Sequence, residues 1–377
     1  MSAESVAVRT WTVDGGDFPY QSVLTAYRRC GKALVPDDLL DALCDARVHA
    51  GGELLSFLDV LLDKRDGVYD YRSYLALPVL TPYLDDRDLL TVLLVADLMR
   101  FEAAACDDLS GPLPVMPPED ALVEKRLRHA LRVIRPALDR LGWSTPVLEP
   151  GVRAEARAVC ETVAAKASDA QQLMVRCSVL PVDVVHDEYL FIRVLQTFET
   201  AFAQLVRDLE AAVDALTAGA AAGAEDALCH AATLLREVSP LWSVVATMRV
   251  ESFRRFRQWT EGASAIQSRH YKLMESLARR PDDARLGSAA YQNVPEIQAQ
   301  VLLGLPSVDA AYREARLTLA EHAAVGAAMA DFAASIDAWR RTHYRLATRM
   351  LGTDTGGTGY TNGTSYLAQA REIPVFS

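Results

Sequence analysis

The chain has 377 residues, of which 50% are hydrophobic, and a formal net charge of -11. A chain of this length can bury a large core in one domain or two. The acidic balance argues against a phosphate-binding face, so we expect no nucleic acid partner. The N-terminus lacks a basic-then-apolar signal segment, and no apolar run reaches the ~18 residues that span a bilayer. We therefore expect a cytoplasmic protein with no membrane partner.

The six cysteines lie far apart in helix-like runs, and no two of them form a CxxC pair. This spacing excludes a zinc ribbon, a redox pair and a CxxCH haem attachment. We interpret the cysteines as buried free thiols in a reducing compartment.

The sequence predicts an all-α fold, because alanine and leucine are abundant and β-branched alternation is nearly absent. Proline followed by acidic residues, as after Pro36 and Pro118, is a typical helix start. The predicted helices cover residues 37–49, 52–62, 88–105, 119–141, 153–178, 187–218, 224–260, 263–278 and 307–351. Residues 280–296 are expected to form a surface loop. Prolines near residues 145–151 suggest a boundary between an N-terminal helical region, 1–150, and a C-terminal core, 151–377.

Three tyrosines are concentrated at Tyr69, Tyr71 and Tyr74, which by themselves suggest only packing. Further along, the triplet that begins at His186 places two carboxylates at the positive end of a helix dipole, and we interpret it as structural. The helix that follows carries an apolar stripe through Phe191 and Leu195, as a core helix does.

A third segment combines an aromatic ring with a guanidinium group. Phe253 and Arg257 are four residues apart and are therefore neighbours on one helical face. Such a pair fits a ligand with a ring at one end and a carboxylate at the other, because guanidinium binds carboxylate through two parallel hydrogen bonds. We expect the adjacent Arg254 and Arg255 to be solvated.

The last long helix places a histidine on an apolar stripe. Phe332, Ile336, Trp339, His343 and Met350 lie on one face of this helix. A buried imidazole needs a partner for its ring nitrogens, and a metal is one that suits an apolar setting. A loop rich in glycine and threonine follows and offers N–H and hydroxyl groups to a charged or zwitterionic ligand.

Together these segments resemble the tryptophan 2,3-dioxygenase family, the histidine-ligated haem oxygenases of aromatic amino acids, whose relatives include haem-dependent aromatic amino acid hydroxylases. The family has an HDExLF…HQ…E helix, an F-x-x-FR…ASG-x-QS segment and a W-R-x-x-H…RMLG…GTGG-x-SG-x-x-YL ending. This chain shows HDEYLFIRVLQTFE, FRRFRQWTEGASAIQS and WRRTHYRLATRMLGTDTGGTGYTNGTSYL in the same order, with one extra residue near Gly356. The tyrosine segment is similar to the family's N-terminal Y-x-x-YL, which reaches into a neighbouring subunit, but it lies much further upstream.

The resemblance implies a haem-binding helical bundle of the tryptophan 2,3-dioxygenase type with an extended N-terminal helical region. It also implies a role for each matching residue. His343 would be the proximal ligand of the haem iron, Arg257 would hold the substrate carboxylate, and Phe191 and Phe253 would flank the aromatic ring. The remaining matches are assigned in the same way: Thr358 to the substrate's amino and carboxylate end, Ser264 to a haem propionate or the substrate, Trp339 and Gly357 to the haem, and Tyr71 to the site of a partner subunit.

The chain departs from the family at the distal position. Where the family has its distal histidine, this chain has Leu195, which leaves that side of the substrate pocket apolar, and we assign no acid or base there. Some relatives attach haem through a cysteine four residues after the proximal histidine. That position is Ala347 here, so we expect non-covalent haem b.

We predict a haem-dependent oxygenase that inserts oxygen into the ring of a free aromatic L-amino acid, with L-tryptophan or a tryptophan derivative as first choice. The oxidant would be O2 or H2O2, and the protein would form a homo-oligomer, a dimer or a tetramer. One alternative is a ring hydroxylase of a tyrosine-type substrate in specialised metabolism, which the missing distal histidine and the N-terminal extension favour. A second alternative is a non-catalytic haem sensor or scaffold.

Overall fold

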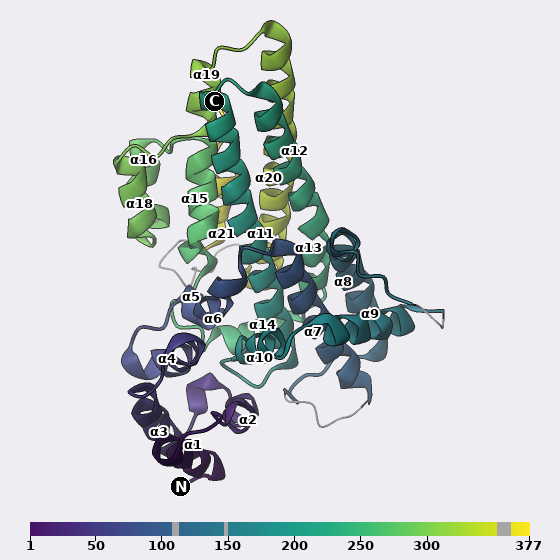
Figure 1. Ribbon diagram of the computed structural model, residues 1–377, viewed down its shortest axis with the longest axis vertical. Coiled ribbons are helices and arrows are strands. Elements are labelled where there is room, and N and C mark those ends of the chain that lie inside the picture. The colour runs from purple at the N-terminus through teal and green to yellow at the C-terminus, as the bar shows by residue number, and fades with distance from the viewer. Residues whose placement is uncertain (108–112, 147–149, 353–362) are drawn as a thin grey trace. The chain divides into compact units, whose positions relative to one another are not determined.

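The fold is built of helices. The computed structural model, shown in Figure 1, describes residues 1–107, 113–146, 150–352 and 363–377. Over these residues the regular structure is helical, apart from one isolated bridge between Val115 and Val185. The predicted all-α fold is confirmed. None of the helices in these ranges has the length and apolar character needed to cross a bilayer.

The helices follow one another closely along the chain. The longer ones are α1 (Ala3–Asp14), α2 (Tyr20–Cys30), α3 (Asp37–Arg47), α4 (Gly52–Asp66), α7 (Arg87–Asp107), α8 (Asp120–Leu141), α9 (Val152–Lys166), α10 (Asp169–Cys177), α11 (His186–Thr217), α12 (Ala221–Val238), α14 (Val250–Arg257), α15 (Arg269–Ala278), α18 (Pro295–Leu302), α20 (Leu319–Leu351) and α21 (Thr364–Arg371). The shorter ones are α5 (Tyr71–Tyr74), α6 (Leu77–Leu80), α13 (Pro240–Val245), α16 (Asp283–Leu286), α17 (Ala289–Gln292), α19 (Val308–Glu314) and the 3₁₀ turns η1 (Lys32–Leu34), η2 (Thr81–Tyr83) and η3 (Ala265–Gln267).

Two predicted helices were too long because a capping side chain inside the apolar run starts a new helix. The hydroxyl of Ser168 accepts the N–H of Gln171 and separates α9 from α10. A reciprocal capping box between Thr318 and Glu321 starts α20, so residues 307–351 are not one helix. The predicted helix at residues 224–260 also divides, into α12, α13 and α14, although no side-chain cap starts α14 and α13 begins at Pro240. A side chain that satisfies the free N–H groups at a helix start outweighs the continuity of the hydrophobic pattern.

The prediction of a surface loop at residues 280–296 is wrong. This segment forms α16 and α17 and leads into α18, and Leu286, Ala290, Tyr291 and Val294 are buried in one hydrophobic cluster. The helical period was not visible there because each helix is only about one turn long.

The chain forms two compact units. The first consists of Met1–Thr197 and Ser243–Ala263, and the second of Phe198–Trp242 and Ser264–Ser377. In the first unit α7, α8 and α9 pack against one another, and α1 packs against α3. In the second unit α12 packs along α20, as Figure 1 shows, and α21 packs against α20. Helix α11 supplies residues to both units.

Candidate functional site

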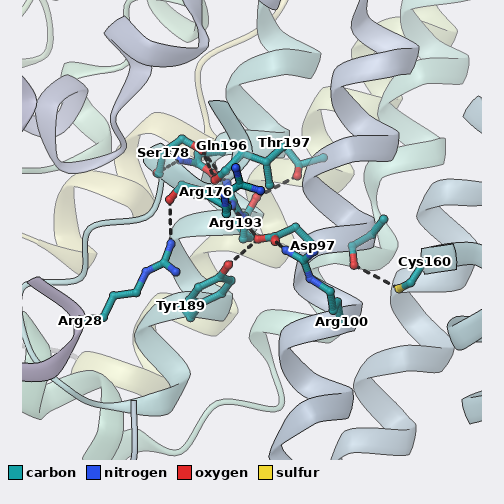
Figure 2. Close-up of polar contacts among 12 residues, drawn as sticks. Arg28, Asp97, Arg100, Cys160, Arg176, Ser178, Tyr189, Arg193, Gln196 and Thr197 are labelled. Carbon is teal, nitrogen blue, oxygen red and sulfur yellow. Dashed lines mark hydrogen bonds and ion pairs between the residues drawn. The ribbon is translucent and has the colours of Figure 1, made fainter. Parts of the chain in front are cut away.

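A buried polar network fixes the first half of α11 in the first unit (Figure 2). The guanidinium of Arg193 donates to Asp97 at 2.8 Å, to Ser178 Oγ at 2.8 Å and to Gln196 Oε1 at 2.8 Å, and Tyr189 donates its hydroxyl to the same Asp97. All five side chains are buried. Because buried polar groups are costly without partners, this network permits only one rotation of α11 about its axis.

That rotation determines which side chains α11 presents on its opposite face. Phe191 and Leu195 lie about half a turn away from Arg193, and both are partly buried. Phe191 forms an aromatic cluster with two residues of α14. Its ring centroid lies 5.7 Å from that of Phe253 and 5.4 Å from that of Phe256, and the latter two lie 5.4 Å apart nearly edge to face. The structure thus brings the two predicted ring-flanking residues together.

Arg257 ends α14, one turn after Phe253 on the same side of the helix. Its side chain is partly buried, and desolvation lowers the pKa of Arg257 below its ordinary value. The guanidinium stays protonated at physiological pH all the same. A partly desolvated cation beside an aromatic cluster is suited to bind a carboxylate.

The sequence predicted that the neighbouring Arg255 is solvated. Its side chain is only half exposed, because it forms an ion pair with Asp183. Its Nε donates to Asp183 at 2.9 Å, and Asp183 is itself only 8% exposed. Sequence reasoning missed Arg193, Gln196 and Asp183 because their partners are remote in sequence. No local sequence pattern points to these three residues.

The tyrosine segment lies within the first unit of its own chain. Asp70 and Ser73 form a capping box at the start of α5, and Tyr71 and Tyr74 are 3% exposed. The carbonyl of Leu75 accepts the side-chain amide of Gln196, next to Leu195 on α11, at 2.8 Å. The contribution of Tyr71 to a partner subunit's site stays a prediction.

In the second unit, His343 of α20 is partly buried and packs against aromatic side chains. Its ring stacks on Trp242 at a centroid distance of 5.2 Å and lies 5.3 Å from Trp339. Trp339 in turn contacts Phe198 and Tyr271 at 5.9 and 5.3 Å. The predicted apolar setting of His343 is therefore observed.

The imidazole of His343 lacks a polar partner in the described part of the chain, where no hydrogen bond reaches either ring nitrogen. Burial alone lowers the pKa of His343 to about 4, so the ring is neutral at physiological pH. The indole N–H groups of Trp242 and Trp339 are also buried without an acceptor among these residues. A neutral imidazole with a free nitrogen lone pair is the form that binds haem iron, so these residues fit the group that the resemblance implies.

A charged cluster anchors the C-terminal segment on the same unit. Arg340, three residues before His343, donates to the hydroxyl of Tyr271 at 3.0 Å and to the carbonyl of Ile373 at 2.6 Å. The buried Glu275 accepts from Lys272 at 3.0 Å. Arg340 therefore links α20 to α15 and to the C-terminal segment.

The other predicted residues are distributed as follows. Ser264 precedes η3 in the second unit, and its N–H donates to Gln267 Oε1 at 3.1 Å. Thr358 and Gly357 lie outside the described residues. Phe191, Leu195, Phe253, Arg257 and Tyr71 belong to the first unit, and Ser264, Trp339 and His343 to the second.

Comparison with known proteins identifies the family. The family model described as tryptophan 2,3-dioxygenase matches residues 164–324, which include Phe191 and Arg257 but not His343. A tryptophan 2,3-dioxygenase of Anaeromyxobacter dehalogenans is 29% identical over 51% of this chain and 84% of its own length. Proteins of the same name from a Nocardioides species and from Bradyrhizobium diazoefficiens are 30% and 26% identical, over 48% and 52% of this chain and 79% and 83% of their own lengths. The chain belongs to the tryptophan 2,3-dioxygenase family.

Proposed function

We propose that this protein is a haem-dependent oxygenase that inserts oxygen into the ring of a free aromatic L-amino acid. L-tryptophan or a tryptophan derivative is the first choice, since the similar proteins bear the name of a tryptophan enzyme. The observation that carries the proposal is the neutral imidazole of His343, which packs against Trp242 and Trp339 and has no hydrogen bond from the described residues.

His343 would bind the haem iron, with Trp339, Ser264 and Gly357 beside the cofactor. When bound, haem supplies the activation of the oxidant, which no amino acid side chain can provide. Position 347 holds alanine, so the chain offers no thiol there, and we propose non-covalent haem b. We assign this role to a catalytic core of residues 151–377, with residues 1–150 as an N-terminal helical region.

Residues of the first unit, together with Thr358, would bind and orient the amino acid. Arg257 would pair with its carboxylate, Thr358 would contact its amino and carboxylate end, and Phe191 and Phe253 would flank its ring. Fixing both ends of the substrate selects which ring carbon meets the oxidant, and such orientation can supply a large part of the rate enhancement. Leu195 excludes water from the ring and neither donates nor accepts a proton.

Leu195 also favours the second candidate, a ring hydroxylase of a tyrosine-type substrate. An apolar side chain offers no partner to an indole N–H, so the pocket has less reason to prefer tryptophan. For either substrate we propose O2 or H2O2 as the oxidant, a cytoplasmic protein and a homo-oligomer, a dimer or a tetramer.

Anaerobic titration of the reduced holoprotein with L-tryptophan and L-tyrosine tests the proposal. We expect one of them to shift the Soret band, and the product mass then separates dioxygenation from hydroxylation. Arg257→Leu should weaken binding by about 10²-fold, since a charge-assisted fork is lost, while haem content stays unchanged. Arg254→Leu, an exposed neighbour on the same helix, is the matched control. Normal substrate binding by Arg257→Leu would contradict the assigned anchor, and no shift with any aromatic amino acid would favour a haem sensor or scaffold.

A further inference from the structure

Helix α14 is too short to hold its own position. It has 8 residues, and only Ser252 and Phe256 are fully buried. A helix of this length is unstable by itself, and its placement depends on contacts from outside. Since α14 carries both Phe253 and Arg257, whatever fixes its two ends also fixes the proposed substrate anchor.

At the N-terminal end, α14 is held by Asp187 from the first turn of α11. One oxygen of this carboxylate accepts the backbone N–H of Arg249, the residue before α14, at 3.1 Å. The other accepts Arg126 at 2.6 Å, and Arg126 also donates to the hydroxyl of Thr247 at 2.9 Å. Asp187 and Arg126 are each 1% exposed. The residue before α14 is therefore bound to α11 through a buried hydrogen-bond network.

At the C-terminal end, α14 is held by Asp183. Arg255 donates to its two carboxylate oxygens at 2.9 and 3.3 Å, in a forked ion pair. Although the Arg255 side chain is half exposed, Asp183 is buried, so the pair has one rigid member. Such a forked pair fixes direction as well as distance.

Asp183 is rigid because its loop is held on several sides. Glu188 accepts the N–H groups of Val182 and Asp183 at 2.7 and 2.9 Å. Lys32 of the N-terminal region donates its backbone N–H to the carbonyl of Pro181 at 2.8 Å. The start of α11 therefore holds both ends of α14. Asp187 binds the N-terminal end directly, and Glu188 binds the loop that carries Asp183, which pairs with Arg255 near the C-terminal end.

We propose that Asp187, Asp183 and Arg255 are positioning residues that set the place and direction of Arg257. The proposal rests on the proposed function, in which Arg257 binds the substrate carboxylate. None of the three residues needs to touch the substrate. The two carboxylates keep α14 against α11, so that the guanidinium and the aromatic cluster of Phe191 and Phe253 hold a constant separation.

The test measures the dissociation constant of L-tryptophan from the Soret shift of the holoprotein. Arg255→Met should weaken binding by about tenfold, since small misplacements of an orienting group can cost up to about 10²-fold. Arg254→Met, which removes a neighbouring exposed cation, should leave binding unchanged. Arg255→Lys, which keeps the charge beside Asp183, should recover part of the loss. Haem content checks that each variant is folded.

A double-mutant cycle separates positioning of Arg257 from a general structural role. If Arg255 acts through Arg257, Arg255→Met should have little further effect once position 257 is leucine. The proposal is wrong if Arg255→Met binds tryptophan as the parent does, or if it weakens binding by the same factor in the Arg257→Leu background. A parent protein that shifts with neither L-tryptophan nor L-tyrosine would instead overturn the proposed function on which this inference rests, and if only tyrosine gives a shift, tyrosine serves as the probe in the same cycle.

Discussion

Replacement of Arg126 by methionine tests the buried network at the start of α11. Arg126 is 1% exposed, and it donates to both oxygens of Glu102 at 3.1 Å and to Asp187 at 2.6 Å. The side chains of these two acids are only 1% and 2% exposed. Methionine fills a similar volume without the charge, so the substitution leaves two buried carboxylates facing each other.

The expected loss of stability is large. Removing one member of a buried ion pair costs about 3–5 kcal/mol, against the roughly 5–15 kcal/mol that holds a typical domain folded. Burial would raise the pKa of Glu102, but Arg126 and, to a lesser degree, His186 keep it below its usual range. Without Arg126 this pKa must rise, and folding then requires the carboxyl group to bind a proton. The loss should therefore be greatest at neutral pH and shrink as the pH falls toward about 5.

Urea unfolding of the haem-free protein at pH 7.5 and pH 5.5 measures the effect. We expect Arg126→Met to lower the midpoint strongly at pH 7.5 and less at pH 5.5. Arg132→Met, which changes an exposed residue of the same helix, should leave the midpoint unchanged at both pH values. Adding Glu102→Leu to Arg126→Met should recover part of the stability, because one of the unpaired charges is then gone. An unchanged midpoint, or a loss independent of pH, would refute this reasoning.

Two further predictions concern positions away from this network. Gly31 has φ +79°, and a Cβ there would lie 2.6 Å from the carbonyl oxygen of Val182. Gly31→Ala should therefore cost at least about 1–3 kcal/mol in urea unfolding, whereas Gly223→Ala in α12 should not destabilise; equal midpoints for the two variants would contradict the account. The pKa of Glu275 is held well below its usual range by Lys272 and Arg285, which outweigh the effect of burial. Glu275→Gln should cost about 2–3 kcal/mol at pH 7, and the difference from the parent should close as the pH falls below about 4; a difference that persists in acid would show that the charge is not responsible.

Hydrophobic periodicity in the sequence was enough to predict the long helices and the setting of His343. Residues three and four apart on one helix face share an environment, so the stripe containing Trp339 and His343 implied an imidazole among apolar side chains. Periodicity failed where a single side chain overrules it, as at Ser168 and Thr318. Local side-chain hydrogen bonds end or start a helix without interrupting the apolar pattern.

Long-range polar contacts were beyond the reach of the sequence. Arg255 looked like a surface cation because its partner, Asp183, lies 72 residues earlier in the chain. Arg193 was not singled out from the sequence, although it is the centre of a buried network. A charged residue in an apolar run has no visible partner until the fold brings the two together.

The proposed bond between His343 and haem iron is tested most directly by haem titration followed by absorption spectroscopy. The parent protein and His322→Ala, which removes an exposed histidine from the same helix, should bind haem and show a Soret band. His343→Ala should fold normally and lose that band, and added imidazole should restore it. A His343→Ala protein that binds haem with the parent's affinity and spectrum would contradict the central claim.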